Sequence, residues 1–125
     1  MYLKNKNMKR VILIGFTVLF GTLCINAQSS PEGKWNTGQH NTIVEISELD
    51  GELKGKFVSS DNDRVEIGKI MLKDLKFEDG TWKGKIYSMR RESWFPAELK
   101  PEGNELNLEV FAGKRSRQVT WTQKS

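Results

Sequence analysis

The side chains that could carry out nucleophilic or acid–base chemistry are few in this chain. His40 is its one histidine and lies between Gln39 and Asn41 in a turn-like segment. A serine or threonine nucleophile needs a neighbouring base, and His40 is the only imidazole that could take this role. A histidine in a polar turn is most often a solvated loop residue. The sequence therefore predicts a protein that is not an enzyme.

Carboxylates suggest two further kinds of site, and their spacing favours neither. Asp61, Asp63 and Glu66 lie close together, but they lack the spacing of a helix-flanked calcium loop. Glu98 and Glu109 fall on neighbouring predicted strands, on an outer face beside lysines, where charge pairing across strands explains them. A zinc site would need a second histidine or a cysteine. We therefore expect no metal site and no cofactor.

Positive charge gathers in two short clusters at predicted turns, Arg90-Arg91 and Lys114-Arg115-x-Arg117. Such clusters could meet a phosphate group or an acidic membrane surface. The simpler interpretation is that they are solvated turn residues of a neutral protein.

Tryptophans are the largest side chains that could contact a ligand. Trp35, Trp82 and Trp121 each fall on an inward face of a predicted strand, where a large ring fills the end of a barrel. Core packing explains these three more simply than ligand contact. Trp94 falls on the outer face, so a neighbouring segment covers it or it belongs to a contact surface.

The N-terminal segment has the three parts of a secretory signal peptide. MYLKNKNMKR is basic, VILIGFTVLFGTLCI is apolar, and polar NAQSSPEG follows. The apolar run is shorter than the roughly 20 residues of a membrane-spanning helix. We expect residues 1–27 to be removed after Ala27, which gives a periplasmic or secreted protein without a transmembrane segment. Two alternatives stay open, a retained anchor and a lipidated Cys24, although Leu23 is too large for the usual lipoprotein pattern.

Removal of this segment makes the mature protein formally neutral. The chain has 20 Lys and Arg and 16 Asp and Glu, and four of the basic residues lie within 1–27. A nucleic-acid-binding protein is expected to present a net basic surface, so composition does not support that class. The sole cysteine, Cys24, is also removed. The remaining 98 of 125 residues suit one domain with a small core and no disulfide.

The elements that must position these side chains are predicted to be β-strands. In Thr42–Ser59, two alternating runs flank Asp50-Gly51, a dipeptide that favours the two-residue turn of a hairpin. With this turn, Ile46 pairs with Gly55 and Val44 pairs with Phe57. One face of the hairpin is then apolar and the other is charged, as in a half-buried antiparallel sheet.

Short alternating runs recur along the rest of the chain. Arg64–Phe77 is the least regular, and a strand with a bulge near Lys73-Asp74 is favoured over a helix because Gly68 weakens a helix. Pro96 has no N–H group, so its strand is expected to be interrupted or partly unpaired. The other strands are expected at 34–37, 82–88, 94–100, 105–111 and 116–123.

These runs predict an all-β fold. Strands joined by short turns are antiparallel neighbours, and closing the sheet removes its exposed edges. We therefore predict a small up-and-down antiparallel barrel of about eight strands in residues 33–125, preceded by a polar leader at 28–32.

The order of the motifs resembles a known family. GKW at 33–35 is similar to the opening motif of lipocalins and the wider calycin group. IVEI with a G-x-L-x-G-K hairpin at 43–56, I-x-L-K-x-L-K at 70–76, W-x-G-K-I at 82–86 and T-W-T at 120–122 resemble a family of secreted bacterial proteins, domain of unknown function 2147. The resemblance implies an exported lipocalin-like barrel and no particular chemistry. The chain departs from the family at Gln123, where an arginine is usual, and in a shorter loop after the hairpin.

An eight-stranded barrel can be filled by its own side chains or can hold one small ligand. Gly55, Gly84 and Ala97 are small inward residues that would leave room. We therefore expect non-catalytic binding of a small apolar or amphipathic ligand. The alternative is an envelope-associated protein–protein interaction module with a solid core and an unknown partner. The residues expected to line the interior are Trp35, Val44, Ile46, Phe57, Ile70, Leu72, Trp82, Ile86, Phe95, Leu99, Leu108, Val110 and Trp121.

Overall fold

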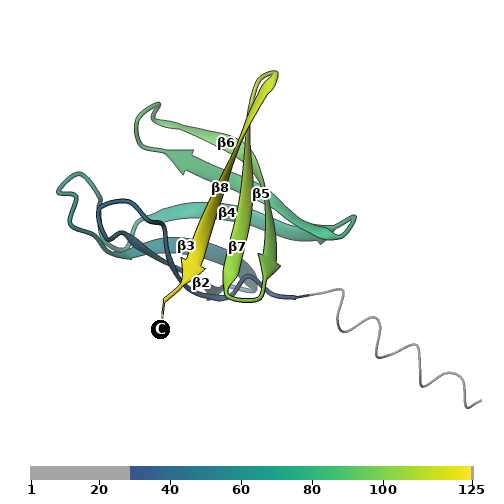
Figure 1. Cartoon of the computed structure of the whole chain (residues 1–125), viewed down its shortest axis with the longest axis horizontal. Helices are drawn as coiled ribbons and strands as arrows, with labels where there is room; N and C mark the ends of the chain where they lie inside the picture. The colour runs from purple at the N-terminus through teal and green to yellow at the C-terminus, as the bar shows by residue number, and fades with distance from the viewer. Residues whose placement is uncertain (1–28, 125) are drawn as a thin grey trace, which may run out of the picture.

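Eight antiparallel strands close into a barrel in residues 29–124, the part of the chain that the computed structural model describes (Figure 1). Each strand pairs with the next, and β8 returns to pair with β1, so the predicted up-and-down barrel is confirmed. No helix of these residues is long and apolar enough to cross a membrane. The predicted signal peptide lies outside the described residues. The strands are β1 (Gly33–Asn36), β2 (Ile43–Leu49), β3 (Glu52–Ser59), β4 (Ile70–Glu78), β5 (Thr81–Ser88), β6 (Ser93–Glu102), β7 (Glu105–Ala112) and β8 (Arg115–Gln123).

The β2–β3 hairpin has the register predicted from its alternation. Ile46 pairs with Gly55 and Val44 pairs with Phe57. The loop consists of Asp50 and Gly51, with φ angles of 55° and 83°. Positive φ at both positions is what the expected turn requires.

The strand predicted over Arg64–Phe77 is shorter than expected. Residues 60–69 form a loop, and β4 begins only at Ile70. Gly68 has a φ of 92°, and its N–H donates to the Phe57 carbonyl at 2.7 Å. The Asn62 side chain accepts the Arg64 N–H at 2.9 Å, a local bond that favours a turn. These local bonds keep the start of the segment out of the sheet.

β4 contains two irregularities that decide which of its side chains enter the core. The first is the bulge predicted near Lys73-Asp74, where the register against β5 shifts and Asp74 has a φ of 57°. It brings Leu75 into the core. The second lies against β3 and places Ile70 opposite Lys56. Ile70 is therefore half-buried and outside the core, contrary to expectation, and Met71 is buried in its place.

The polar leader crosses one end of the barrel, which we call the closed end. Trp35 Nε1 donates to the Pro31 carbonyl at 2.9 Å, and Trp82 Nε1 donates to the Ser29 carbonyl at 2.8 Å. These tryptophans come from β1 and β5, which stand on opposite sides of the ring of strands. Pro31 itself is fully buried. Residues 29–32 of the leader are thus part of the folded structure.

The barrel next to the closed end is solid, and we call this part the closed half. Its side chains belong to the buried core and do not line the cavity at the other end of the barrel. Val44, Ile46, Leu72, Leu99 and Leu106 are each at most 1% exposed. The full set is Trp35, Val44, Ile46, Leu72, Leu75, Ala97, Leu99 and Leu106.

The small inward residues do not leave the room that we expected. A Cβ atom on Gly84 would lie 2.6 Å from Leu75 Cδ2, and one on Gly55 would lie 3.0 Å from the Leu72 side chain. Ala97 is itself packed in the core. The glycines therefore allow two leucines to approach the sheet closely, and the leucines occupy the space.

At the other end of the barrel, residues 93–96 of β6 are not paired with β7. We call this the open end, and the part of the barrel next to it the open half. β6 pairs with β5 as far as Ser93, whereas its pairing with β7 begins only at Ala97. Pro96, directly before Ala97, has no N–H to donate to a ladder. The partial unpairing expected at Pro96 is confirmed, although the strand is not interrupted. β7 and β8 continue as a hairpin that projects beyond the rest of the barrel (Figure 1).

Candidate functional site

A cavity of about 840 Å³ opens at this end of the barrel. Its floor consists of four apolar side chains that are also part of the buried core: Phe57, Met71, Leu108 and Trp121. They come from β3, β4, β7 and β8, so strands from around the barrel contribute to one surface. The volume lies within the range of about 300–1,000 Å³ that is usual for small-molecule sites.

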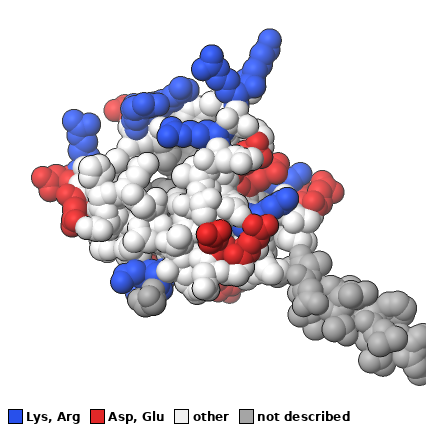
Figure 2. Space-filling view, viewed as in Figure 1, with Lys and Arg blue, Asp and Glu red and all other residues white. Residues whose placement is uncertain are grey.

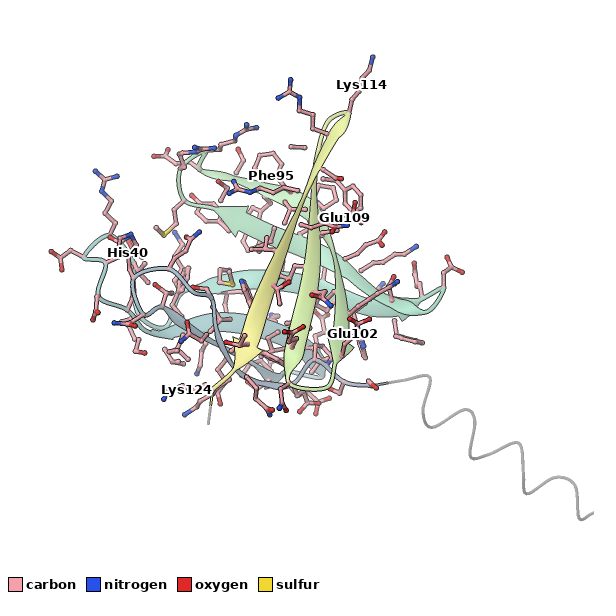
Figure 3. The ribbon with its side chains drawn as sticks, in the orientation of Figure 1. His40, Phe95, Glu102, Glu109, Lys114 and Lys124 are labelled. Atoms are coloured by element: carbon pink, nitrogen blue, oxygen red, sulfur yellow. The ribbon has the colours of Figure 1, made fainter. Side chains whose placement is uncertain are left out.

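The wall above the floor is also apolar and is half-buried. Val65 reaches it from the β3–β4 loop, and Ile86 and Phe95 face each other across β5 and β6. Val110 and Val119 come from the projecting β7–β8 hairpin. In Figure 3, Phe95 lies below the tip of this hairpin at Lys114, while Glu102 and Lys124 lie at the opposite end. The apolar surface thus continues from the core to the opening.

The rim of the cavity is strongly basic. Arg90 and Arg91 come from the β5–β6 turn, and Arg115 and Arg117 come from the start of β8. All four are exposed. Figure 2 shows Lys and Arg side chains projecting at the upper edge of the molecule, above this end of the barrel. Among the described residues that line the cavity there is no Asp or Glu.

The alternation of β8 explains why two arginines face this opening. Trp121 and Val119 point inward, opposite Leu106 and Leu108. Arg117 and Arg115 continue the same two-residue phase toward the start of the strand. The sequence predicted this arginine cluster as turn residues. Following the inward alternation of Trp121 and Val119 for two further steps, to Arg117 and Arg115, would have placed both arginines at the cavity.

The rim guanidinium groups make few contacts with the protein. Arg91 lies over the ring of Phe95, 5.6 Å from the ring centre to the guanidinium carbon. Such a cation–π contact holds the charge beside the cavity wall. Within residues 29–124, none of the four guanidinium groups forms an ion pair with a carboxylate; the ion pair there joins Lys83 and Asp79. Because all four arginines are exposed, their guanidinium groups are accessible to solvent.

His40 and the hydroxyl groups near the opening connect loops to one another. The His40 carbonyl accepts the Asp61 N–H at 2.8 Å, which joins the β1–β2 and β3–β4 loops. Thr42 Oγ1 and Ser60 Oγ lie 2.7 Å apart across the same two loops. Ser88 Oγ accepts the Arg91 N–H at 3.2 Å. The His40 side chain is exposed. These contacts are typical of residues that shape a loop.

The carboxylates considered as possible metal or acid–base groups do not line the cavity. Asp61 accepts a 2.6 Å hydrogen bond from the Asn41 side chain, and Asp61, Asp63 and Glu66 are exposed on the β3–β4 loop. Glu98 stands opposite Glu109 in the β6–β7 ladder, on neighbouring strands as expected. In the described part of the chain, no three His, Cys, Asp or Glu side chains are grouped closely enough to hold a metal ion.

The tryptophans separate into different environments. Trp121 lies on the cavity floor, whereas Trp35 is buried in the closed half. Trp82 is half-buried at the closed end, where its ring packs 5.4 Å from that of Phe77. Trp94 packs 5.4 Å from Tyr87 with Lys73 Nζ 4.2 Å above its ring, so neighbouring side chains cover it.

The predicted interior residues divide between the two halves of the barrel. Phe57, Ile86, Phe95, Leu108, Val110 and Trp121 line the cavity. Trp35, Val44, Ile46, Leu72 and Leu99 fill the closed half, Trp82 lies at the closed end, and Ile70 contributes to neither.

Several residues that line the cavity were not among those predicted from the strand alternation to face the interior. Met71 enters through a bulge, and Val65 enters through a loop, so neither follows a regular strand alternation. The same is true of the turn residues near the opening. The residues missed as lining are Thr37, Gln39, His40, Thr42, Asn62, Val65, Met71, Tyr87, Ser88, Met89, Arg90, Arg91, Ala112, Arg115, Ser116, Arg117 and Val119.

A second hollow of about 1,100 Å³ lies at the closed end. There the start of β3, before Gly55, is not paired with the part of β4 that follows Leu72. Exposed side chains of both signs border it, among them Glu52, Asp74 and Lys76. Its lining as a whole is more polar than that of the first cavity, so we take the cavity at the open end as the candidate site.

The chain matches no protein-family model, no curated protein and no solved structure.

Proposed function

We propose that this protein binds a small apolar or amphipathic ligand without chemical turnover, inside the open half of its barrel. The observation that carries the proposal is the cavity of about 840 Å³ whose floor is formed by core side chains. Ligand sites are typically concave and largely apolar, with a few polar groups that fix orientation. Phe57, Met71, Leu108 and Trp121 supply the apolar surface here.

The cavity favours ligand binding over the alternative of an interaction module with a solid core. Apolar surface that faces an opening loses the stabilisation that burial gives. In this barrel, Ile86, Phe95, Val110 and Val119 are only half-buried. A ligand that covers them would remove this apolar surface from water.

We also propose that the protein is exported and belongs to the secreted family that its motifs resemble. Two features support this proposal. The basic and apolar N-terminal segment is that of a signal peptide. The strand order is that of an up-and-down barrel, the fold that the resemblance implies.

Tryptophan fluorescence together with thermal unfolding tests the binding proposal. The purified protein is titrated with fatty acids, aromatic compounds and other amphiphiles. Binding to the folded state raises the melting temperature by mass action, and contact with Trp121 changes the fluorescence. In Trp121→Phe the fluorescence change is expected to disappear while the rise in melting temperature remains. Trp35→Phe is the matched control and should keep both signals, because Trp35 lies in the closed half.

Phe57→Ala provides the decisive variant because it enlarges the floor. Removal of a large aromatic ring from a solid core costs about 3–5 kcal/mol. Next to an open cavity we expect a smaller loss, together with a preference for bulkier compounds. A panel that gives neither signal, combined with a full penalty for Phe57→Ala, would overturn the proposal.

A further inference from the structure

We propose that the ligand is an anionic amphiphile: its apolar part lies on the cavity floor and its carboxylate or phosphate head group binds the arginines of the rim. This inference rests on the proposed function and adds the chemical class of the ligand to it. It follows from how charge is distributed around the opening.

Positive charge at the rim comes from two turns that are far apart in sequence. Arg90 and Arg91 precede β6, and Arg115 and Arg117 begin β8. The fold brings them to one opening because the β5–β6 and β7–β8 turns lie at the same end of an up-and-down barrel. Each cluster alone could be explained as solvated turn residues. That explanation is weaker once two arginine pairs from different turns border the same opening.

The acidic residues on the turns near the opening do not line the cavity. Glu92, Asp61, Asp63 and Glu66 are exposed on the neighbouring turns, and none of them lines the cavity. Asp61 is bonded to the Asn41 side chain at 2.6 Å. The mature sequence is expected to be neutral overall, so the rim is a local concentration of positive charge.

The rim arginines are suited to bind an anion. A guanidinium group offers planar donors that match carboxylate and phosphate oxygens in pairs. Arg91 is held over Phe95, a side chain of the cavity wall, so its charge lies beside the apolar surface. A ligand that satisfies both regions must have an anionic head next to an apolar body.

Four probes with the same twelve-carbon chain test the head group: dodecanoate, dodecyl phosphate, dodecanol and dodecyltrimethylammonium. Each is titrated against the protein below its micelle-forming concentration, and dissociation constants are measured by calorimetry. Charge-assisted hydrogen bonds strengthen binding and solvent exposure weakens them. We therefore expect both anions to bind about tenfold more tightly than dodecanol and the cation to bind most weakly.

Arg115→Gln/Arg117→Gln is expected to remove most of this preference, so the affinity for the two anions should fall much more than the affinity for dodecanol. Lys100→Gln/Lys124→Gln is the matched control: it removes the same charge from exposed residues away from the rim (Figure 3 labels Lys124). This control should keep the preference. Thermal unfolding of both variants verifies that they fold.

The outcomes separate this inference from the function on which it rests. Equal affinity for dodecanol and dodecanoate would overturn the anionic head group while supporting an apolar site. Equal losses in the two double variants would also overturn it, because long-range charge would then explain the preference. Binding of none of the probes would overturn the proposed function and this inference with it. A preference for only one anion would support the inference and identify the head group.

Discussion

The two halves of this barrel are built from the same strands and differ in how their interiors are used. In the closed half, core side chains such as Ile46, Leu99 and Leu106 are at most 1% exposed, and the leader crosses the end. In the open half, Ile86, Phe95 and other apolar side chains border a cavity of about 840 Å³. The same inward alternation therefore produces a solid core at one end and a site at the other.

The difference comes from how the strands end. At the closed end, Trp35 and Trp82 anchor the leader through their indole N–H groups. At the open end, β6 is not paired with β7 before Ala97, whereas β7 and β8 stay paired with each other as far as Ala112 and Arg115. We infer that the closed half supplies most of the stability, which allows the open half to keep apolar surface uncovered.

The largest effect that distinguishes the two halves is expected from a charge placed in the closed half. Ile46→Lys should destabilise the fold by several kcal/mol, because an unpaired charge would be buried among apolar side chains. Lys54→Glu is the control on the outer face of the same hairpin and should change stability by about 0.5 kcal/mol or less. Denaturant unfolding measures both. Equal effects would contradict the inward position of Ile46.

Sequence alone predicted the strands well where two-residue alternation is regular. The β2–β3 register and the strand β7 follow directly from which residues are apolar, because one face must be buried. Residues 64–69 of the loop were predicted as strand because their apolar residues, Val65 and Ile67, alternate as they would in a strand. The turn at Gly68 depends on a bond to Phe57 in another element.

The site was predicted only in part, because it depends on where strands stop pairing. Phe57, Phe95 and Trp121 were expected inside and do line the cavity. Gly84 was expected to leave room, but whether it does depends on Leu75, which a bulge turns inward. The alternation of β8 is visible in the sequence and places Arg115 and Arg117 on its inward side. That they share an opening with Arg90 and Arg91 depends on how the strands close into a barrel, which no local sequence window shows.

An intermediate effect is expected when a methyl group is added within the closed half. In Gly84→Ala, the new Cβ would lie 2.6 Å from Leu75 Cδ2 and 2.6 Å from the Lys73 carbonyl oxygen. Overpacking of this kind costs about 1–3 kcal/mol. Gly55→Ala should cost less, because its new Cβ meets the Leu72 side chain at 3.0 Å and no backbone atom that close. Denaturant midpoints compare the two variants, and a larger cost for Gly55→Ala would contradict the packing described at the bulge.

The smallest effect gives the most direct comparison, because it makes the same chemical change in each half. Ile46→Val and Ile86→Val both remove one methyl group, the first in the closed half and the second in the cavity wall. In a solid core this change typically costs about 0.5–1.5 kcal/mol, since it removes buried surface and leaves a small void.

At Ile86 the methyl group already borders open space, so its loss creates no new enclosed void, and only part of its surface was buried. We therefore expect Ile86→Val to cost less than Ile46→Val, with the difference measured by denaturant unfolding of both variants in parallel. A saturating ligand that fills the cavity should bring the two costs closer together, because the side chain of Ile86 would then be packed on both sides. Equal costs without ligand would mean that the open half is as well packed as the closed half, and the comparison on which the binding site rests would fail.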